Sequence, residues 1–157
     1  MKRLLMLAMA ALLLTACGDT EESKPVDKKP AEEKPAEQKV TLSETEANFT
    51  DVSVDIEKAY LKGDTLIIET LFTNDSYEGE IPFSTGAYIE VKQGDAMLEE
   101  SSGVMEGNRG DYFFKNKKGI HTPVKFEYKL PNKDDVTIRL GAKRSDDEPV
   151  DITATIE

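Results

Sequence analysis

Apolar and polar residues alternate in run after run from about residue 50 onwards, and this pattern limits the possible fold most. The clearest run has Val124, Phe126, Tyr128 and Leu130 at every second position, with charged residues between them. Successive side chains of a strand point to opposite faces, so period two predicts strands with one buried and one wet face, as in antiparallel sheets. No stretch shows a comparable helical period.

The alternating runs, separated by turn-forming residues, predict an all-β fold. Strands are expected at residues 50–60, 64–73, 86–92, 96–100, 110–115, 120–130, 135–143 and 149–156. Seven or eight short strands within residues 49–157 predict one domain, an immunoglobulin-like antiparallel β-sandwich of 7–8 strands. A small closed barrel is the alternative.

The first residues predict export from the cytoplasm. Lys2 and Arg3 precede an apolar run of eleven residues, from Leu4 to Leu14. A membrane-spanning helix needs about twenty such residues, so we expect residues 1–16 to be a cleaved signal-peptide helix. Cys17 is the only cysteine of the chain, which excludes an intramolecular disulfide and a multi-thiolate metal site.

Leu14, Thr15, Ala16 and Cys17 together resemble the lipobox of bacterial lipoproteins. In that family the cysteine receives a diacylglyceryl group and signal peptidase II cleaves before it. The resemblance implies covalent diacylglycerol on Cys17 and a lipid-anchored position on the extracytoplasmic face of the cell membrane. Two acyl chains give stable anchoring. The alternative is an ordinary secretory signal with an incidental cysteine.

Residues 17–48 predict a lipidated cysteine followed by a disordered linker. The segment Lys29–Glu33 nearly repeats as Lys34–Gln38, and each copy contains a proline and mixed charges. Regular prolines block helix propagation, and a segment without apolar groups cannot form a core. We expect this linker to act as a spacer.

The formal net charge is −11, with 31 acidic and 20 basic residues. Such a surface repels the phosphates of nucleic acids, so nucleic-acid binding is not expected. Solubility is the simplest role of the excess acidic groups.

Three phrases in the chain carry a resemblance to a family. Residues 71–76 (LFTNDS) close a strand, residues 89–98 (IEVKQGDAML) form a strand, a glycine turn and a return strand, and residues 119–130 (GIHTPVKFEYKL) lead into the clearest alternating run. This order resembles the telokin-like, immunoglobulin-like lipoprotein domains of unknown function found in Gram-positive bacteria. Pro123 departs from that family's pattern. The resemblance implies a sandwich fold and a surface location, and brings no catalytic residues.

One segment, residues 103–118, contains a candidate binding surface: Arg109, Tyr112, Phe113 and Phe114. Three consecutive aromatic residues cannot all point inward from one strand, so at least one is expected to face outward or to lie under the loop. Exposed aromatic side chains often mark binding surfaces. The alternative is a bulged edge strand whose two phenylalanines cap the core.

Other candidate sites are weaker. Loop carboxylates at Asp134, Asp135, Asp146 and Asp147 can form a weak Ca²⁺ site if their two loops lie at one end of the domain. No other metal or cofactor is expected. His121 is the only histidine, and no serine elbow accompanies it, so no catalytic residue is assigned.

These observations favour a non-catalytic surface module that binds an unknown surface protein, wall polymer or small ligand. One alternative is a carboxylate-dependent hydrolase of envelope components, which requires two acids converging in a pocket, at least one with a raised pKa. The other is a purely structural or spacing protein.

Overall fold

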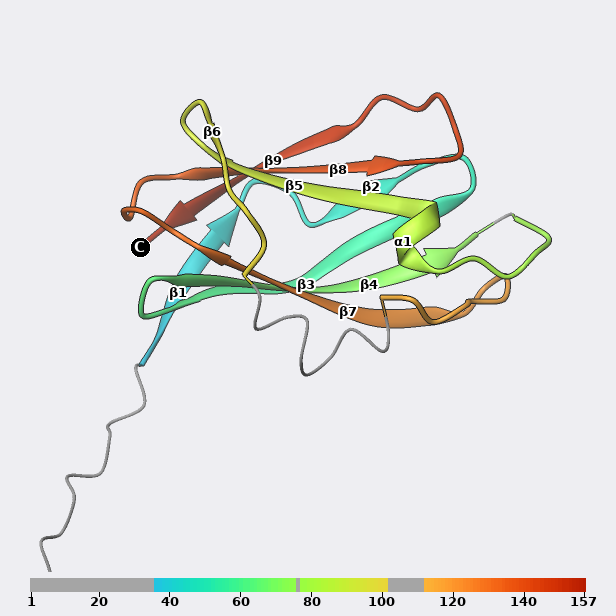
Figure 1. Ribbon diagram of the computed structural model, residues 1–157, viewed down its shortest axis with the longest axis horizontal. Coiled ribbons are helices and arrows are strands. Elements are labelled where there is room, and N and C mark those ends of the chain that lie inside the picture. Colours follow the sequence, from blue (N-terminus) through green and yellow to red (C-terminus); the bar gives the residue numbers. More distant parts are fainter. Residues whose placement is uncertain (1–35, 76, 102–111) are drawn as a thin grey trace, which may run out of the picture. The chain divides into compact units, whose positions relative to one another are not determined.

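The computed structural model describes residues 36–75, 77–101 and 112–157, and this part of the chain consists mostly of antiparallel strands (Figure 1). The predicted all-β class is therefore confirmed. The elements are β1 Glu37–Leu42, β2 Glu46–Asn48, β3 Val52–Lys62, β4 Thr65–Asn74, α1 Phe83–Gly86, β5 Ala87–Gln93, β6 Ala96–Met97, β7 His121–Lys129, β8 Val136–Ala142 and β9 Val150–Ile156. The predicted signal-peptide helix and residues 17–35 of the predicted linker lie outside the described residues.

One strand joins two parts of the sheet. β1 pairs with β3 through residues 37–39 and with β9 through residues 40–42. The strand order is β6-β5-β8-β9-β1-β3-β4-β7, with β2 paired to β3 beside this path. The sheet curls, so that β5, β8 and β9 lie across from β3, β4 and β7 (Figure 1).

The alternating side chains of the sequence form the inner face of this curled sheet. In β7, for example, Thr122, Val124, Phe126 and Tyr128 are buried, whereas the residues between them are exposed or half-buried. Burial of each large apolar side chain contributes roughly 1.5–3 kcal/mol. The largest fully buried side chains are Phe72, Phe83, Phe126, Leu61, Leu66, Ile68, Ile81, Ile138, Leu140 and Ile152.

Residues 37–48 belong to the sheet, so the predicted linker boundary at residue 48 is wrong. Val40 and Ala47 are the buried side chains of β1 and β2, one in each strand. One buried side chain in a strand gives no alternating pattern, so the sequence of β1 and β2 resembles the charged sequence before it. The position of β1 comes instead from backbone pairing with β3 and with β9, the last strand of the chain, and a local pattern does not reveal such pairing.

Two predicted strands also differ in the structure. The one expected at residues 96–100 is reduced to the two residues of β6. Residues 112–115, the described part of the strand expected at 110–115, form a turn and irregular chain. Pro123 lies within β7, the last strand in the order, where a residue without an N–H group is tolerated.

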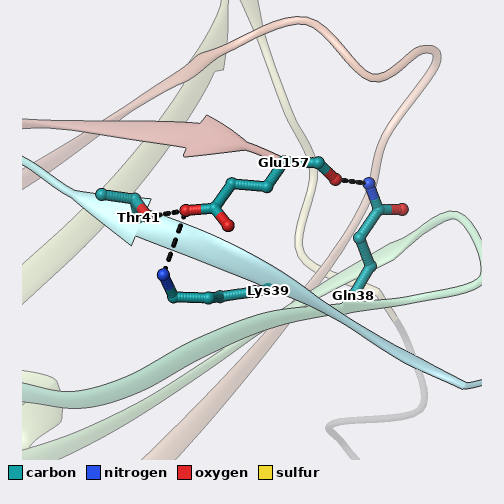
Figure 2. Close-up of polar contacts among 4 residues, drawn as sticks. All are labelled: Gln38, Lys39, Thr41 and Glu157. Carbon is teal, nitrogen blue, oxygen red and sulfur yellow. Dashed lines mark hydrogen bonds and ion pairs between the residues drawn. The ribbon is translucent and has the colours of Figure 1, made fainter.

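Glu157 fastens β1 from the side of β9 (Figure 2). Its carboxylate accepts hydrogen bonds from the Thr41 hydroxyl and from Lys39 Nζ, the latter at 3.1 Å, and its backbone carbonyl accepts one from Gln38 Nε2. We call these four residues the Glu157 clamp. The contacts are exposed to solvent, so water competes for each of them.

Candidate functional site

Large apolar side chains that remain exposed gather in one loop. Of the four in the described residues, Phe113, Phe114 and Ile120 lie within residues 112–120, and Met97 lies in β6. Phe113 is 59% exposed and Phe114 is 58% exposed. We call residues 112–120 the aromatic loop. Clustering of this kind distinguishes an interaction surface from apolar residues scattered singly.

Tyr112 connects the aromatic loop to the core. Its ring lies 5.4 Å from that of Phe83 and 6.2 Å from that of Phe126, both of which are buried. On its other side, the ring of Phe113 meets it edge-on at 4.9 Å. The prediction that at least one of the three aromatic residues faces outward is confirmed. The alternative, in which both phenylalanines cap the core, is wrong because Tyr112 takes that place.

Backbone hydrogen bonds fix the loop at three points. Ile81 and Asn116 exchange two N–H···O=C bonds of 3.0 Å, the pattern of an isolated β-bridge. The Ser84 N–H donates to the Tyr112 carbonyl at 3.2 Å, and the Gly119 N–H donates to the Asn74 carbonyl at 2.7 Å. Gly119 has a φ of 75°, a left-handed conformation that glycine adopts at no steric cost.

A buried asparagine lies under the loop. Asn116 is 0% exposed, and its Nδ2 donates to the carbonyls of Phe72 at 3.3 Å and Ile120 at 3.1 Å. Its Oδ1 accepts a hydrogen bond from the Thr122 hydroxyl. The side chain therefore joins β4, β7 and the loop. A buried amide that satisfies its partners in this way specifies one conformation, because any other leaves polar groups unpaired.

Asn74 extends this network. It is also fully buried, and its Nδ2 donates to the carbonyls of Gly79 at 2.9 Å and Asn116 at 3.2 Å. Together, Asn74, Asn116 and Thr122 hold the aromatic loop against the end of β4. The sequence does not predict that Asn74 and Asn116 are buried, since asparagine in a turn-like segment is ordinarily exposed.

The charges on the loop are positive. Residues 112–120 contain Lys115, Lys117 and Lys118 and no acidic residue. Lys118 Nζ lies 2.9 Å from a carboxylate oxygen of Glu78, and Lys117 Nζ lies 3.9 Å from one of Glu80. The hydrogen bond from Lys118 lowers the pKa of Glu78. Both pairs are exposed, so they exchange easily with solvent or with a charged partner.

Some predicted site residues fall outside the described residues. These are Arg109 of the candidate binding surface and the lipobox residues Leu14, Thr15, Ala16 and Cys17. Within the described part of the chain, no helix is long and apolar enough to cross a membrane.

The predicted Ca²⁺ site is not assembled. Asp134 and Asp135 lie in the turn before β8, whereas Asp146 and Asp147 lie in the turn after it. The seven residues of β8 separate the two turns by roughly 20 Å, too far for a shared ion. Asp147 instead accepts hydrogen bonds from Ser145 Oγ at 2.6 Å and from the Thr50 N–H at 2.6 Å, which lower its pKa. Over residues 36–75, 77–101 and 112–157, no group of three metal-ligating side chains occurs.

His121 begins β7 on the outer face of the sheet. Its Nδ1 lies 2.7 Å from the hydroxyl oxygen of Thr73, its cross-strand neighbour in β4. Thr73 is 3% exposed, so a substrate cannot approach its hydroxyl. The distance also suits a nucleophile and its base, but because the hydroxyl is buried, the pair forms a cross-strand hydrogen bond.

Asp55 has the raised pKa that a carboxylate-dependent hydrolase requires of one of its two acids. Burial, followed by the charge of its cross-strand neighbour Glu46, raises the pKa of Asp55. Asp55 lies on β3 next to Ile56, at the start of an open groove of about 550 Å³ between β1 and β3, but does not itself line that groove. The acids that do line it are Glu37 and Glu57, both exposed. The two-acid pocket that hydrolysis requires is therefore not found among these residues.

Comparisons with known proteins add no assignment. No protein-family model matches the chain, no curated protein matches its sequence, and no solved structure matches its fold. The geometry of the aromatic loop and the sequence of the first residues are therefore the observations that bear on function.

Proposed function

We propose that the chain is a lipoprotein, anchored by diacylglycerol on Cys17 to the extracytoplasmic face of the cell membrane. Its domain is a non-catalytic immunoglobulin-like β-sandwich that binds a partner through the aromatic loop. The signal-like first residues and the lipobox support the anchor. The curled antiparallel sheet, with strands on either side of a common core, supports the sandwich.

The observation that carries the binding role is the exposure of Phe113 and Phe114 on a fixed loop. Exposing two adjacent phenylalanines to water has a cost in free energy, because their apolar area is not buried. Here a buried network holds the backbone that displays them. A loop held in its binding conformation loses little entropy when a partner covers it, which is the advantage of preorganisation.

The binding role is tested by capture from the envelope. The full chain and a Phe113→Ser/Phe114→Ser double variant are each crosslinked in cells and purified with whatever they retain. We expect the double variant to lose specific envelope components, whereas Met97→Ser, which removes another exposed apolar side chain in β6, keeps them. If the double variant and the full chain retain the same components, the loop is not the binding site.

The anchor is tested separately. Cys17→Ser removes the thiol that the lipid would modify, so we expect the protein to leave the membrane fraction and to appear in the soluble fraction. Cys17→Ala serves as a second variant without a hydroxyl. Unchanged membrane retention of both variants would contradict the lipoprotein assignment.

A further inference from the structure

The aromatic loop combines apolar and cationic side chains at one end of the sheet. Phe113, Phe114 and Ile120 supply the apolar area, and Lys115, Lys117 and Lys118 supply the charge. The rest of the chain is strongly acidic, with a net charge of −11 for the whole sequence. The loop itself carries only basic charged side chains. Lys117 and Lys118 lie against Glu80 and Glu78 in exposed pairs, and Lys115 supplies the charge complementary to an anionic partner.

The hydrogen-bonding capacity of the exposed side chains in the loop distinguishes further between classes of partner. Neither phenylalanine can form a hydrogen bond, and Asn116, the amide of the loop, is buried and engaged with Phe72, Ile120 and Thr122. A glycan is recognised through hydrogen bonds to its hydroxyl groups as well as by stacking, and these outward side chains offer only ammonium groups. Aromatic rings next to lysines suit the interface of a bilayer, where rings lie at headgroup level and ammonium groups meet anionic lipids.

The proposed anchor can bring this loop to a bilayer. Glu37 pairs with Lys62 at the end of β3, whereas the loop is bonded to Asn74 at the opposite end of the ten-residue β4 (Figure 1). The distance between these ends is roughly 30 Å. Residues 18–36 can span at most about 65 Å when extended. The covalent length therefore permits the loop to face the membrane that holds Cys17.

We propose that the aromatic loop docks on an anionic phospholipid bilayer. Phe113 and Phe114 enter the interface, and Lys115 and Lys117 lie over the headgroups. This inference rests on the proposed function, since it names the partner of the same loop. Lys117 exchanges its long, exposed contact with Glu80 for lipid phosphate, and Lys115 has no ion pair among residues 36–75, 77–101 and 112–157.

The absence of tryptophan from the chain permits a direct test. Phe113→Trp places a single fluorescent reporter on the loop, and Met97→Trp places one in β6. Met97 pairs with Lys92, next to Gln93, which bonds to the turn before β8, so it lies at the opposite end from the loop. Each full chain, lipidated on Cys17, is reconstituted in phosphatidylglycerol vesicles whose acyl chains carry a bromine quencher. Phosphatidylcholine vesicles are the neutral control.

We expect Trp emission from Phe113→Trp to move to shorter wavelength and to be quenched several-fold more than that from Met97→Trp. The difference should shrink in phosphatidylcholine and at high salt, because the lysines act through screened charge. Lys115→Ser/Lys117→Ser in the reporter chain should reduce the quenching to the phosphatidylcholine level. Solvent-like, unquenched emission from Phe113→Trp in phosphatidylglycerol would overturn the inference, as would stronger quenching of Met97→Trp.

Flotation of the same vesicles separates this failure from failure of the proposed function. If the chain does not float with the vesicles, the anchor is absent. If the chain floats and Phe113→Trp stays in water, while envelope capture still requires Phe113 and Phe114, the loop binds a protein or wall polymer, and only the lipid inference is wrong.

Discussion

Two segments of the domain are fastened by polar side chains, and the environments of those side chains are opposite. The aromatic loop depends on Asn116, which is 0% exposed. β1 is held by the Glu157 clamp, in which the side chains of Lys39 and Glu157 are 74% and 49% exposed. Both networks connect residues far apart in the sequence. Burial differs, and burial decides how much free energy is lost when one partner is removed.

The buried network around Asn116 specifies the conformation of its segment, whereas the exposed Glu157 clamp only reinforces a conformation that backbone pairing already fixes. If a Glu157 contact is lost, water replaces it, and β1 keeps its backbone pairing with β3 and β9. If Asn116 is lost, the carbonyls of Phe72 and Ile120 and the hydroxyl of Thr122 lose a partner that water cannot easily replace. The loop that displays the phenylalanines is thus the segment in which removal of a single side chain leaves buried polar groups unpaired.

The largest effect is expected for Asn116→Ala. Removal of the amide leaves buried polar groups unsatisfied, so we expect the free energy of unfolding to fall by about 3 kcal/mol. Denaturant unfolding monitored by circular dichroism measures it. Lys117→Ala, an exposed change one position away, should alter stability by less than about 0.5 kcal/mol. An equal effect of both substitutions would show that the network does not hold the loop.

A matched pair of Thr→Val substitutions compares the two segments directly. Thr122 donates its hydroxyl to buried Asn116, and Thr41 donates its hydroxyl to the exposed carboxylate of Glu157. We expect Thr122→Val to lower the free energy of unfolding by about 1–2 kcal/mol. Thr41→Val should leave it within experimental error. If both variants lose the same free energy of unfolding, burial does not determine how much these hydrogen bonds stabilise the fold.

The smallest effect is a pH dependence at the clamp. The hydrogen bond from Thr41, and then that from Lys39, lowers the pKa of Glu157. A carboxyl group whose pKa is lowered by folding stabilises the fold above its unfolded pKa, and this contribution is lost as the pH falls through the folded pKa. We therefore expect a loss of stability below about pH 4 that is slightly shallower in Glu157→Gln.

Thermal unfolding from pH 7 to pH 2 measures this dependence. Glu44→Gln is the control, because its side chain makes no hydrogen bond to the part of the domain that the structure describes. A pH profile identical in Glu157→Gln and the unsubstituted chain would indicate that the clamp contributes nothing.

Asparagine illustrates where prediction from the sequence stops. Asn116 and Asn132 both lie in polar, turn-like segments, flanked by lysine and proline residues that favour exposure. The structure buries Asn116 completely and leaves Asn132 exposed in the turn before β8. Nothing within a few residues of either distinguishes them, because the partners of Asn116 include Phe72, 44 positions away.

For Tyr112, Phe113 and Phe114, the sequence predicted part of what the structure shows. The impossibility of three consecutive inward side chains follows from strand geometry alone, and the exposure of Phe113 and Phe114 agrees with it. Which of the three enters the core was not predictable. Tyr112 does so, half-buried against the rings of Phe83 and Phe126, which come from two other elements.

Local sequence was enough to identify most of the strands and their buried faces, because the alternation of side chains is a property of consecutive residues. It was also enough to exclude disulfides, since Cys17 has no partner. The tertiary structure alone brought residues 37–48 into the sheet and buried Asn116 under the aromatic loop. Each of these depends on contacts between distant segments, whose energies no short stretch of sequence contains.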